Sequence, residues 1–354
     1  MSKTVFVLGA GASAHSGTPV MGNFLEIAEG LLRSGEVNEV KEHFERLFDA
    51  RGKLEAIKSK ANLDTYNIET IYAAFEMGKL FGSLPGIDDS SKIDELIISI
   101  RKVISYTLER TTRLPYDNQE GIQPPLYYGT FADIIAELIK NGKSCSIMTF
   151  NYDLGLDYAL YKRKLLMDYA LSDVNMERTH IAYLKLHGSL NWAKCSTCSK
   201  IKPNRQFQFT QTKDGLEYSI IPMIANLKEG SCCGKPFEED PFIVPPTWNK
   251  TGFHTEIGGV WQKAAKELKD AENIFVLGYS LPTTDLFFHY LFALGLDMKT
   301  ILKKFYVYNT DDTGEVKERF SKLLGSGVIQ RFKYVRTSFE NAVTSPRYVR
   351  EFNL

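Results

Sequence analysis

The chain lacks an apolar run long enough to cross a membrane and lacks an excess of charge of either sign. No apolar stretch approaches the roughly 18 to 20 residues that a membrane-spanning helix needs. The 43 Lys and Arg residues balance 43 Asp and Glu residues, so net charge gives no attraction to nucleic acid or to a membrane surface. No run of Lys and Arg predicts a local basic patch either. We therefore expect no membrane anchorage and no direct binding of nucleic acid.

Features of secretion are also missing, and cysteine is scarce. Residues 1–13, MSKTVFVLGAGAS, run straight into a strand-and-glycine pattern without a long apolar core or a small-residue cleavage site. Of only five cysteines in 354 residues, four lie between Cys195 and Cys233. This clustering suits a metal site in a reducing compartment better than a disulfide framework. We expect a cytoplasmic protein.

What the sequence does contain is an alternation of apolar strand-length segments with helical patterns. The expected strands cover residues 4–8, 144–150, 181–188, 273–278 and 304–309. Most of them are continuously apolar, as a parallel strand covered on both faces requires. The helical patterns between them lie at about residues 129–141, 154–162, 256–271, 284–295 and 313–324. This alternation predicts an α/β fold with a doubly wound, Rossmann-like parallel sheet.

Two regions interrupt the alternation. Residues 22–128 show helical periodicity and no convincing core strand, which predicts a helical insertion that forms a lid or an oligomer surface. Residues 192–250 combine the clustered cysteines with scattered Gly, Pro and polar residues, which predicts a small cysteine-rich, zinc-ribbon-like module. The chain has no internal repeat. We expect a single domain over residues 1–354 that carries both additions.

The residues after each expected strand matter most, because ligands of open parallel sheets bind outside the carboxyl ends of the strands. After the first strand comes GAGASAHSGTP, residues 9–19, in which Gly9 and Gly11 allow a tight turn and close approach to a phosphate. A plain structural turn explains the same glycines. No second strand ending in Asp or Glu follows about 20 residues later, which argues against a dehydrogenase of the hydride-transfer type.

Two further strand ends carry side chains suited to catalysis. TFNYD, residues 149–153, places the amide of Asn151 two positions before the carboxylate of Asp153, although Asp153 equally suits the N-cap of the helix that follows. LKLHGSLNW places His187 directly after a strand and before a glycine. Its imidazole suits a general base, and a structural histidine is the alternative.

The last two strand ends are less specific. FVLGYSLPTTD contains Gly278 and Ser280 ahead of a helix, where the hydroxyl suits a phosphate, a ribose or a helix cap. YVYNTDD ends a strand at Asn309, which suits a ribose contact or a turn.

The cysteines predict a structural metal site. Cys195 and Cys198 have the C-x-x-C spacing of half a tetrahedral zinc site. The second half is irregular, because the adjacent pair Cys232 and Cys233 replaces a second C-x-x-C. A degenerate ribbon that folds without metal is the alternative. Four thiolates leave no open coordination position, so zinc is not expected to take part in catalysis.

In this order, the motifs resemble those of the sirtuin superfamily. The matching elements are the glycine loop with its GTP (17–19), the N-x-D, the HG, the cysteine module, the G-x-S and the late Asn. The resemblance implies a sirtuin-like domain that cleaves the nicotinamide–ribose bond of NAD. It implies Asn151 and His187 as catalytic residues, with His187 as the base toward a ribose hydroxyl and Asn151 and Asp153 facing the nicotinamide ribose and carboxamide. The other implied NAD-binding residues are Gly9, Ala10, Gly11, Ser13, Pro19, Gly278, Ser280 and Asn309.

Departures from the family pattern favour one branch of it. Protein-deacylating sirtuins carry G-I-P-D-F-R and T-Q-N-I-D, whereas this chain has GTPVMGNF and TFNYD, with Phe150 at the glutamine position. PFIVPPTWNK (241–250) and the long helical insertion resemble the bacterial sirtuin-like proteins of anti-phage defence, which hydrolyse NAD to nicotinamide and ADP-ribose. We therefore expect an NAD+ glycohydrolase. The alternatives are an NAD-dependent protein deacylase, a non-catalytic module that senses NAD or ADP-ribose, and a structural assembly subunit.

An NAD-depleting effector has to be restrained until it is needed. No segment of the sequence indicates a separate sensor domain, so control is expected from assembly into a homo-oligomer or from a partner protein. In the branch that this chain resembles, such partners include hexameric ATPases and Argonaute-type proteins. The sequence does not choose between them.

Overall fold

Runs of buried apolar residues form the centre of a seven-stranded parallel sheet. The computed structural model describes residues 3–56, 63–171, 181–221, 233–245, 256–283, 285–295 and 301–352. All of β11 and all of β1 except Lys3 are buried, as expected for strands covered on both faces. The sheet comprises β1 (Lys3–Leu8), β4 (Ser144–Thr149), β5 (Met167–Asp168), β6 (Ile181–Lys185), β11 (Asn273–Leu277), β12 (Lys304–Asn309) and β13 (Phe332–Arg336).

The strand order is β13-β12-β11-β1-β4-β6-β5, and every neighbouring pair is parallel. The predicted α/β class with a parallel sheet is therefore confirmed, and the five expected strands correspond to β1, β4, β6, β11 and β12. Two edge strands, β5 and β13, were not predicted. β5 has only two residues, and β13 (FKYVR) mixes charged and aromatic residues, so neither presents a continuous apolar run.

The order of the strands creates a switch point beside β1. The chain proceeds from β1 to β4 and β6 on one side, then returns to β11 on the other side and continues to β12 and β13. Because parallel crossovers are right-handed, this reversal places the helices of the later crossovers on the opposite face of the sheet from those of the earlier crossovers. The helix that follows β13 returns to the first face, where Phe339 packs edge-on against Phe131. The helices are α5 (Leu126–Lys140), α6 (Gly155–Lys162), α8 (Gly258–Lys269), α9 (Leu286–Gly295), α10 (Glu315–Leu323), α11 (Ser326–Ile329), α12 (Phe339–Thr344) and α13 (Pro346–Glu351).

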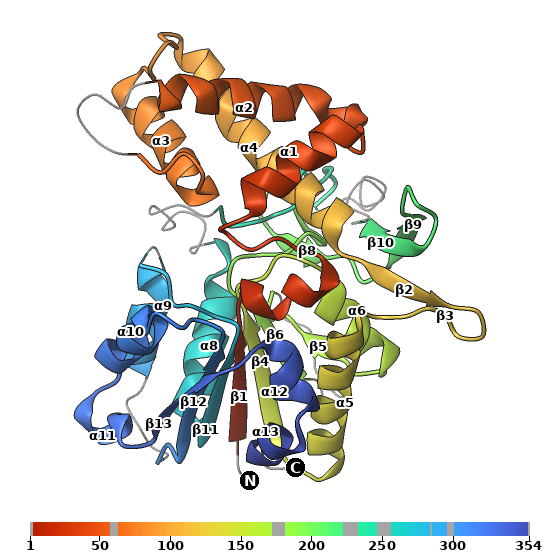
Figure 1. The fold of residues 1–354 in the computed structure, drawn as a ribbon, viewed down its shortest axis with the longest axis vertical. Coiled ribbons are helices and arrows are strands. Elements are labelled where there is room, and N and C mark those ends of the chain that lie inside the picture. The colour runs from red at the N-terminus through yellow and green to blue at the C-terminus, as the bar shows by residue number, and fades with distance from the viewer. Residues whose placement is uncertain are drawn as a thin grey trace.

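A separate group of helices stands at the carboxyl ends of the strands, at the end of the molecule opposite to the two termini (Figure 1). This helical bundle has its own apolar core. Asn67 and Asp89 cap two of its helices, each accepting a hydrogen bond from the backbone N–H two residues later. The bundle comprises α1 (Phe24–Ser34), η3 (Asn38–Val40), α2 (Lys41–Glu55), α3 (Ile68–Phe81) and α4 (Ser90–Thr111). The boundaries 22 and 128 of the expected insertion stay a prediction.

A second, antiparallel sheet joins the two regions that interrupt the strand–helix alternation. Its order is β3-β2-β10-β9, and Tyr218 of β10 pairs with Leu114 of β2. The strands are β2 (Leu114–Asp117), β3 (Gly121–Ile122), β9 (Gln208–Gln211) and β10 (Glu217–Ile221). β2 and β3 fall in a range for which only helices were predicted. A third sheet pairs β7 (Trp192–Lys194) with β8 (Ile201–Pro203).

In the part of the chain that the structure describes, no helix combines the length and apolar character required to span a membrane.

Candidate active site

The loop after β1 is packed tightly against the loop after β11. It forms two short turns, η1 (Ala10–Ala12) and η2 (Ala14–Ser16), and the N–H groups of Gly9 and Gly11 donate to the carbonyls of Leu277 and Gly278 at 3.1 and 3.0 Å. A Cβ on Gly9 would lie 2.6 Å from the Cα of Tyr279, and one on Gly11 would lie 2.9 Å from the carbonyl oxygen of Gly278. The glycines are thus required for the approach of two loops, and contact of this loop with a pyrophosphate stays a prediction.

Ser13 is the centre of a buried hydrogen-bond network. Its hydroxyl donates to Oδ2 of Asp153 at 2.6 Å and accepts from Nδ2 of Asn151 at 2.7 Å. The Tyr128 hydroxyl lies 2.6 Å away and is the donor to Ser13, because the single serine proton is directed to Asp153. Burial raises the pKa of Tyr128 well above its ordinary value, so the phenol stays protonated.

This network holds Asn151 in one orientation. Besides donating to Ser13, its Nδ2 donates to the carbonyl of Gly9 at 2.9 Å, and its backbone N–H donates to the Thr149 hydroxyl at 3.1 Å. The amide therefore links the end of β4 to the loop after β1. An amide that is held in one orientation is preorganised to contact a ligand bound next to it.

Asp153 bonds both to Ser13 and to the start of α6, although the N-cap position of that helix is Leu154 and contact of Asp153 with NAD stays a prediction. Oδ1 accepts the N–H of Gly155, the first residue of α6, at 3.0 Å, while Oδ2 accepts from Ser13. The carboxylate is buried, and this burial raises its pKa, although the charge of Lys185 and the bond from Ser13 act in the opposite direction. Asp153 thus supports the geometry of Asn151 through Ser13.

A fully buried ion pair lies directly beneath this turn. Nζ of Lys185 lies 2.9 Å from Oδ2 of Asp157, and both side chains have no exposed surface. The same ammonium donates to the carbonyl of Asp153 at 2.7 Å, and the hydroxyls of Tyr169 and Tyr183 donate to Asp157 at 2.6 and 3.1 Å. These additional hydrogen bonds offset the free-energy cost of removing the two charges from water. Lys185 thereby fixes the backbone that carries Asn151 and Asp153.

His187 follows β6 and is held by backbone and side-chain contacts. Its carbonyl accepts the N–H of Val244 at 2.7 Å, and the next residue, Gly188, has φ +81°, where a Cβ would lie 2.4 Å from the carbonyl oxygen of Phe242. The imidazole Nε2 lies 3.4 Å from Oδ1 of Asp285. The Phe150 ring meets the imidazole edge-on, at 5.0 Å between centroids.

The loop after β11 brings the remaining predicted residues to the same place. Gly278 has φ +63°, and Leu281, which is buried, has φ +50°, a left-handed conformation that costs a leucine about 1–2 kcal/mol. Asn309, at the end of β12, donates from Nδ2 to the carbonyl of Tyr279 at 3.3 Å and accepts from the N–H of Asp311 at 2.9 Å. It therefore braces the loop in which Ser280 lies.

These strand ends surround one crevice of about 360 Å³. Every catalytic or NAD-binding residue expected from the sequence lines it except Gly9, although the role of each stays a prediction. The lining residues expected from the sequence are Ala10, Gly11, Ser13, Pro19, Asn151, Asp153, His187, Gly278, Ser280 and Asn309.

The helical bundle supplies the opposite wall. Phe24 of α1, Ile68 and Glu69 at the start of α3, and Ile104 and Leu108 of α4 line the crevice. No local sequence pattern marked these residues, because their position depends on how the bundle folds over the sheet. Asp285 was also missed, although it lies in the quoted stretch FVLGYSLPTTD, seven positions after Gly278.

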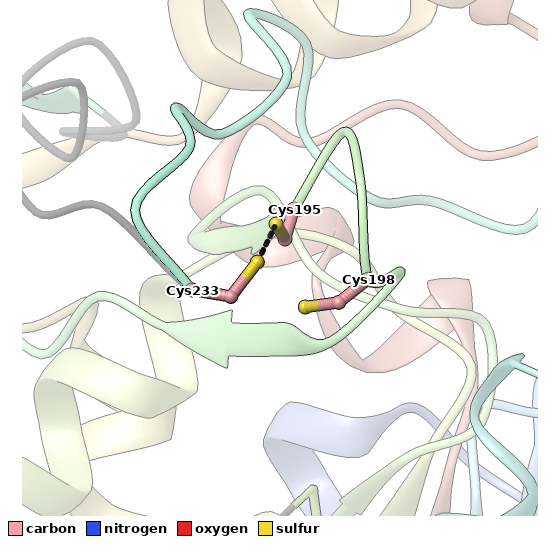
Figure 2. A group of neighbouring side chains, drawn as sticks. All are labelled: Cys195, Cys198 and Cys233. Carbon is pink, nitrogen blue, oxygen red and sulfur yellow. Dashed lines mark hydrogen bonds between the residues drawn. The ribbon is translucent and has the colours of Figure 1, made fainter.

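Three of the four expected metal ligands lie together. The thiols of Cys195, Cys198 and Cys233 point toward one another, with all three sulfurs within 4.8 Å (Figure 2). The 3.8 Å between Sγ of Cys195 and Sγ of Cys233 equals the sulfur–sulfur edge of a tetrahedron with Zn–S bonds of about 2.3 Å. Backbone N–H groups of Cys198 and Thr197 lower the pKa of the Cys195 thiol, which favours the ligating thiolate. The fourth expected ligand, Cys232, lies outside the described residues.

Comparison with known proteins gives distant structural similarity only. No family model matches the chain, and no curated protein matches it. Among solved structures, a Sir2 homologue in complex with NAD is 14% identical with a TM-score of 0.41, covering 99% of this chain and 89% of that chain. A Sir2 structure with a propionylated peptide is 14% identical with a TM-score of 0.38, covering 99% and 92%. Similarity at this level does not assign a family, so function has to be inferred from the crevice itself.

Proposed function

We propose that the chain is an NAD+ glycohydrolase that uses water to cleave the nicotinamide–ribose bond, giving nicotinamide and ADP-ribose. The observation that carries this proposal is the convergence of Asn151, His187 and the glycine loop on one crevice at the switch point of a parallel sheet. The crevice volume of about 360 Å³ lies within the range of small-molecule sites.

The proposed hydrolysis requires water as the nucleophile and one side chain that accepts a proton. The bond from the ribose C1′ to the pyridinium nitrogen breaks, and its electron pair leaves with neutral nicotinamide. The oxocarbenium-like carbon is then attacked by the oxygen of water, which releases one proton. His187 is the residue proposed to accept a proton, from water or from a ribose hydroxyl, since imidazole is a base near neutral pH.

The other residues are proposed to position the substrate. Asn151 orients the ribose or the attacking water, because its amide is already held by Gly9 and Ser13. Asp153 acts through Ser13 on the same amide. The residues proposed for the phosphates and the adenosine side are Ala10, Gly11, Pro19, Gly278, Ser280 and Asn309.

Hydrolysis is favoured over deacylation by the surroundings of Phe150. Its ring stacks on Tyr279 at 4.2 Å between centroids and meets the imidazole of His187 at 5.0 Å. An apolar ring therefore occupies the position at which the deacylase pattern has a glutamine. We propose that the wall formed by the helical bundle on the other side also limits the room for an acyl-lysine peptide.

We extend the proposal to the biological setting on the strength of the sequence resemblance. The chain is proposed to be an NAD-depleting effector of anti-phage defence, controlled by homo-oligomerisation or by a partner such as a hexameric ATPase or an Argonaute-type protein. We also propose that the cysteine module holds structural zinc, with Cys195, Cys198 and Cys233 among its ligands.

Product analysis in ¹⁸O-labelled water tests the proposed chemistry. NAD+ is incubated with the protein with and without an acetyl-lysine peptide, and nicotinamide, ADP-ribose and cyclic ADP-ribose are separated by chromatography. We expect release of nicotinamide without peptide, with one ¹⁸O atom in ADP-ribose. Release that requires the peptide and yields an acylated ADP-ribose would instead identify a deacylase.

A further inference from the structure

We propose that Asp285 is a positioning residue that orients the imidazole of His187 and holds its proton on Nε2. This inference rests on the proposed function, because it assigns His187 as the base of NAD+ hydrolysis. It concerns a residue for which the sequence motifs gave no role.

The pairing of the two side chains is close and largely shielded from water. Oδ1 of Asp285 lies 3.4 Å from Nε2 of His187, and the side chains are 5% and 9% exposed. Both residues line the crevice, so the pair stands where the reaction is proposed to occur. A charge–dipole or charge–charge contact is strengthened in such a poorly hydrated position.

Asp285 is itself fixed by a second contact. Its other oxygen, Oδ2, accepts a hydrogen bond from the Tyr279 hydroxyl at 2.8 Å. Burial raises the pKa of Tyr279 well above its ordinary value, so the phenol remains a donor. The backbone of Asp285 is held as α9 begins, since its carbonyl accepts from the N–H of Phe288 at 3.1 Å. The carboxylate therefore has one oxygen toward tyrosine and one toward histidine.

The aromatic surroundings restrict the movement of the pair. The Phe150 ring lies against both the imidazole of His187 and the ring of Tyr279. Phe288 of α9 meets the Tyr279 and Phe150 rings edge-on, at 5.6 and 5.3 Å between centroids. The imidazole of His187 consequently has a carboxylate at one edge and aromatic rings packed around it. These contacts hold the ring in one orientation, as a general base requires.

The position of the Asp285 carboxylate determines which ring nitrogen of His187 carries the proton. A neutral imidazole carries one proton, and a carboxylate beside one nitrogen retains the proton there. With the proton on Nε2, the lone pair lies on Nδ1, which is then the atom that accepts a proton from water or ribose. As that proton arrives, the Asp285 carboxylate stabilises the imidazolium that forms.

A purely structural role for Asp285, as an ion pair that anchors the start of α9, makes a different prediction. In that case its replacement lowers stability and NAD+ affinity together, without a selective effect on turnover. The readouts below separate the two roles.

The first test compares Asp285→Asn and Asp285→Glu with the parent. The control is Asp49→Asn, whose carboxylate is 68% exposed and pairs with Lys53 on the surface of α2. We expect kcat of nicotinamide release to fall about 10- to 100-fold in Asp285→Asn, with KM and the Kd for NAD+ changed less than about twofold. Asp285→Glu retains more activity, because the carboxylate is kept. A parental kcat in Asp285→Asn, or a loss confined to KM, overturns the inference.

The second test does not depend on activity. The histidine rings are labelled with ¹⁵N, and the His187 signals are identified by their absence in His187→Gln. We expect the Nε2–H tautomer in the parent and a mixture of tautomers in Asp285→Asn. An Nδ1–H tautomer in the parent overturns the inference even if Asp285→Asn fails to fold. A parent that shows the Nε2–H tautomer but never releases nicotinamide contradicts the proposed function and leaves the pairing intact.

Discussion

The hydroxyl of Ser13 connects residues that lie far apart in the sequence. Tyr128 lies on α5, whereas Asn151 and Asp153 follow β4, and all three bond to the same oxygen. Because that hydroxyl uses its one proton and two acceptor positions, no other residue type of its size satisfies all three partners. At the residue scale, the geometry of Asn151 depends on Ser13 more than on any other single side chain.

Removal of this hydroxyl is expected to impair both stability and activity. Ser13→Ala leaves Asp153 and Asn151 each without one buried partner, which costs about 1–3 kcal/mol of unfolding free energy. Nicotinamide release should fall at least about tenfold as Asn151 loses its anchor. Chemical denaturation and the NAD+ assay measure the two effects.

Ser146→Ala is the matched control for this substitution. Ser146 is also fully buried, but its hydroxyl has no hydrogen-bond partner among the residues that the structure describes, so its removal should change stability by less than about 0.5 kcal/mol. Equal effects of the two substitutions would show that the Ser13 network has no special role.

The ion pair beneath the crevice leads to a second prediction. Lys185→Met leaves the buried carboxylate of Asp157 without its cation, so the free energy of unfolding should fall by about 3–5 kcal/mol. In Lys185→Met combined with Asp157→Asn, this pair leaves no unpaired buried charge, so part of the loss should be recovered. Urea denaturation of both variants measures these changes in the free energy of unfolding. A double variant that is less stable than Lys185→Met would contradict this explanation.

At the scale of elements, helix α4 carries a glutamate whose carboxyl group is buried, where the charged form is unfavourable. Glu109 is buried on this helix, and burial raises its pKa from the ordinary 4.5 to about 7, despite the nearby guanidinium of Arg110. The folded state thus resists ionisation of Glu109. The stability of the parent is therefore expected to fall as pH rises from about 4.5 to about 7.

Glu109→Gln removes this titration. Relative to the parent, its free energy of unfolding should increase by roughly 2–3 kcal/mol between pH 4.5 and pH 7, because only the parent has to ionise a buried acid. Thermal or urea denaturation across this range measures the difference. A difference that is the same at all pH values would show that Glu109 does not titrate in this window.

The helices and strands also show which parts of the fold could be predicted from the sequence and which could not. The central strands were predictable because most of them are continuous apolar runs, and the ends of β4 and β6 pointed to Asn151 and His187. β13 was missed because an edge strand needs no such run. Glu69 and Asp285 could not be assigned to the crevice, because their positions follow from the packing of α3 and α9 rather than from any local pattern.

For the molecule as a whole, two parts of the structure enclose the crevice, and a third, the cysteine module, contributes none of its described residues to the lining. The parallel sheet supplies the strand ends, and the helical bundle supplies the facing wall (Figure 1). The turn between β7 and β8 carries Cys195 and Cys198, and Cys233 joins them from a later part of the chain (Figure 2). β7 begins five residues after His187, so the cysteine module is directly attached to the segment that carries the proposed base.

Metal analysis tests the zinc proposal. The purified chain is expected to contain about one zinc ion, and Cys198→Ser should lose most of it and lower the melting temperature. Cys145→Ser is the control and should retain zinc, since burial raises the pKa of the Cys145 thiol to about 12 and this residue lies in β4. Zinc content that is equal in both variants, or absent from the parent, would contradict the proposal.

The central claim is that this crevice hydrolyses NAD+, and the most direct measurement is nicotinamide release by the purified chain. It should be measured over a range of protein concentrations, so that activity depending on self-assembly is detected, and beside Asn151→Ala and Asn141→Ala. Asn141 is an exposed residue at the end of α5 and serves as the control. We predict release by the parent and by Asn141→Ala, and loss of at least about 100-fold in Asn151→Ala. Release that Asn151→Ala retains at the parental rate would contradict the account.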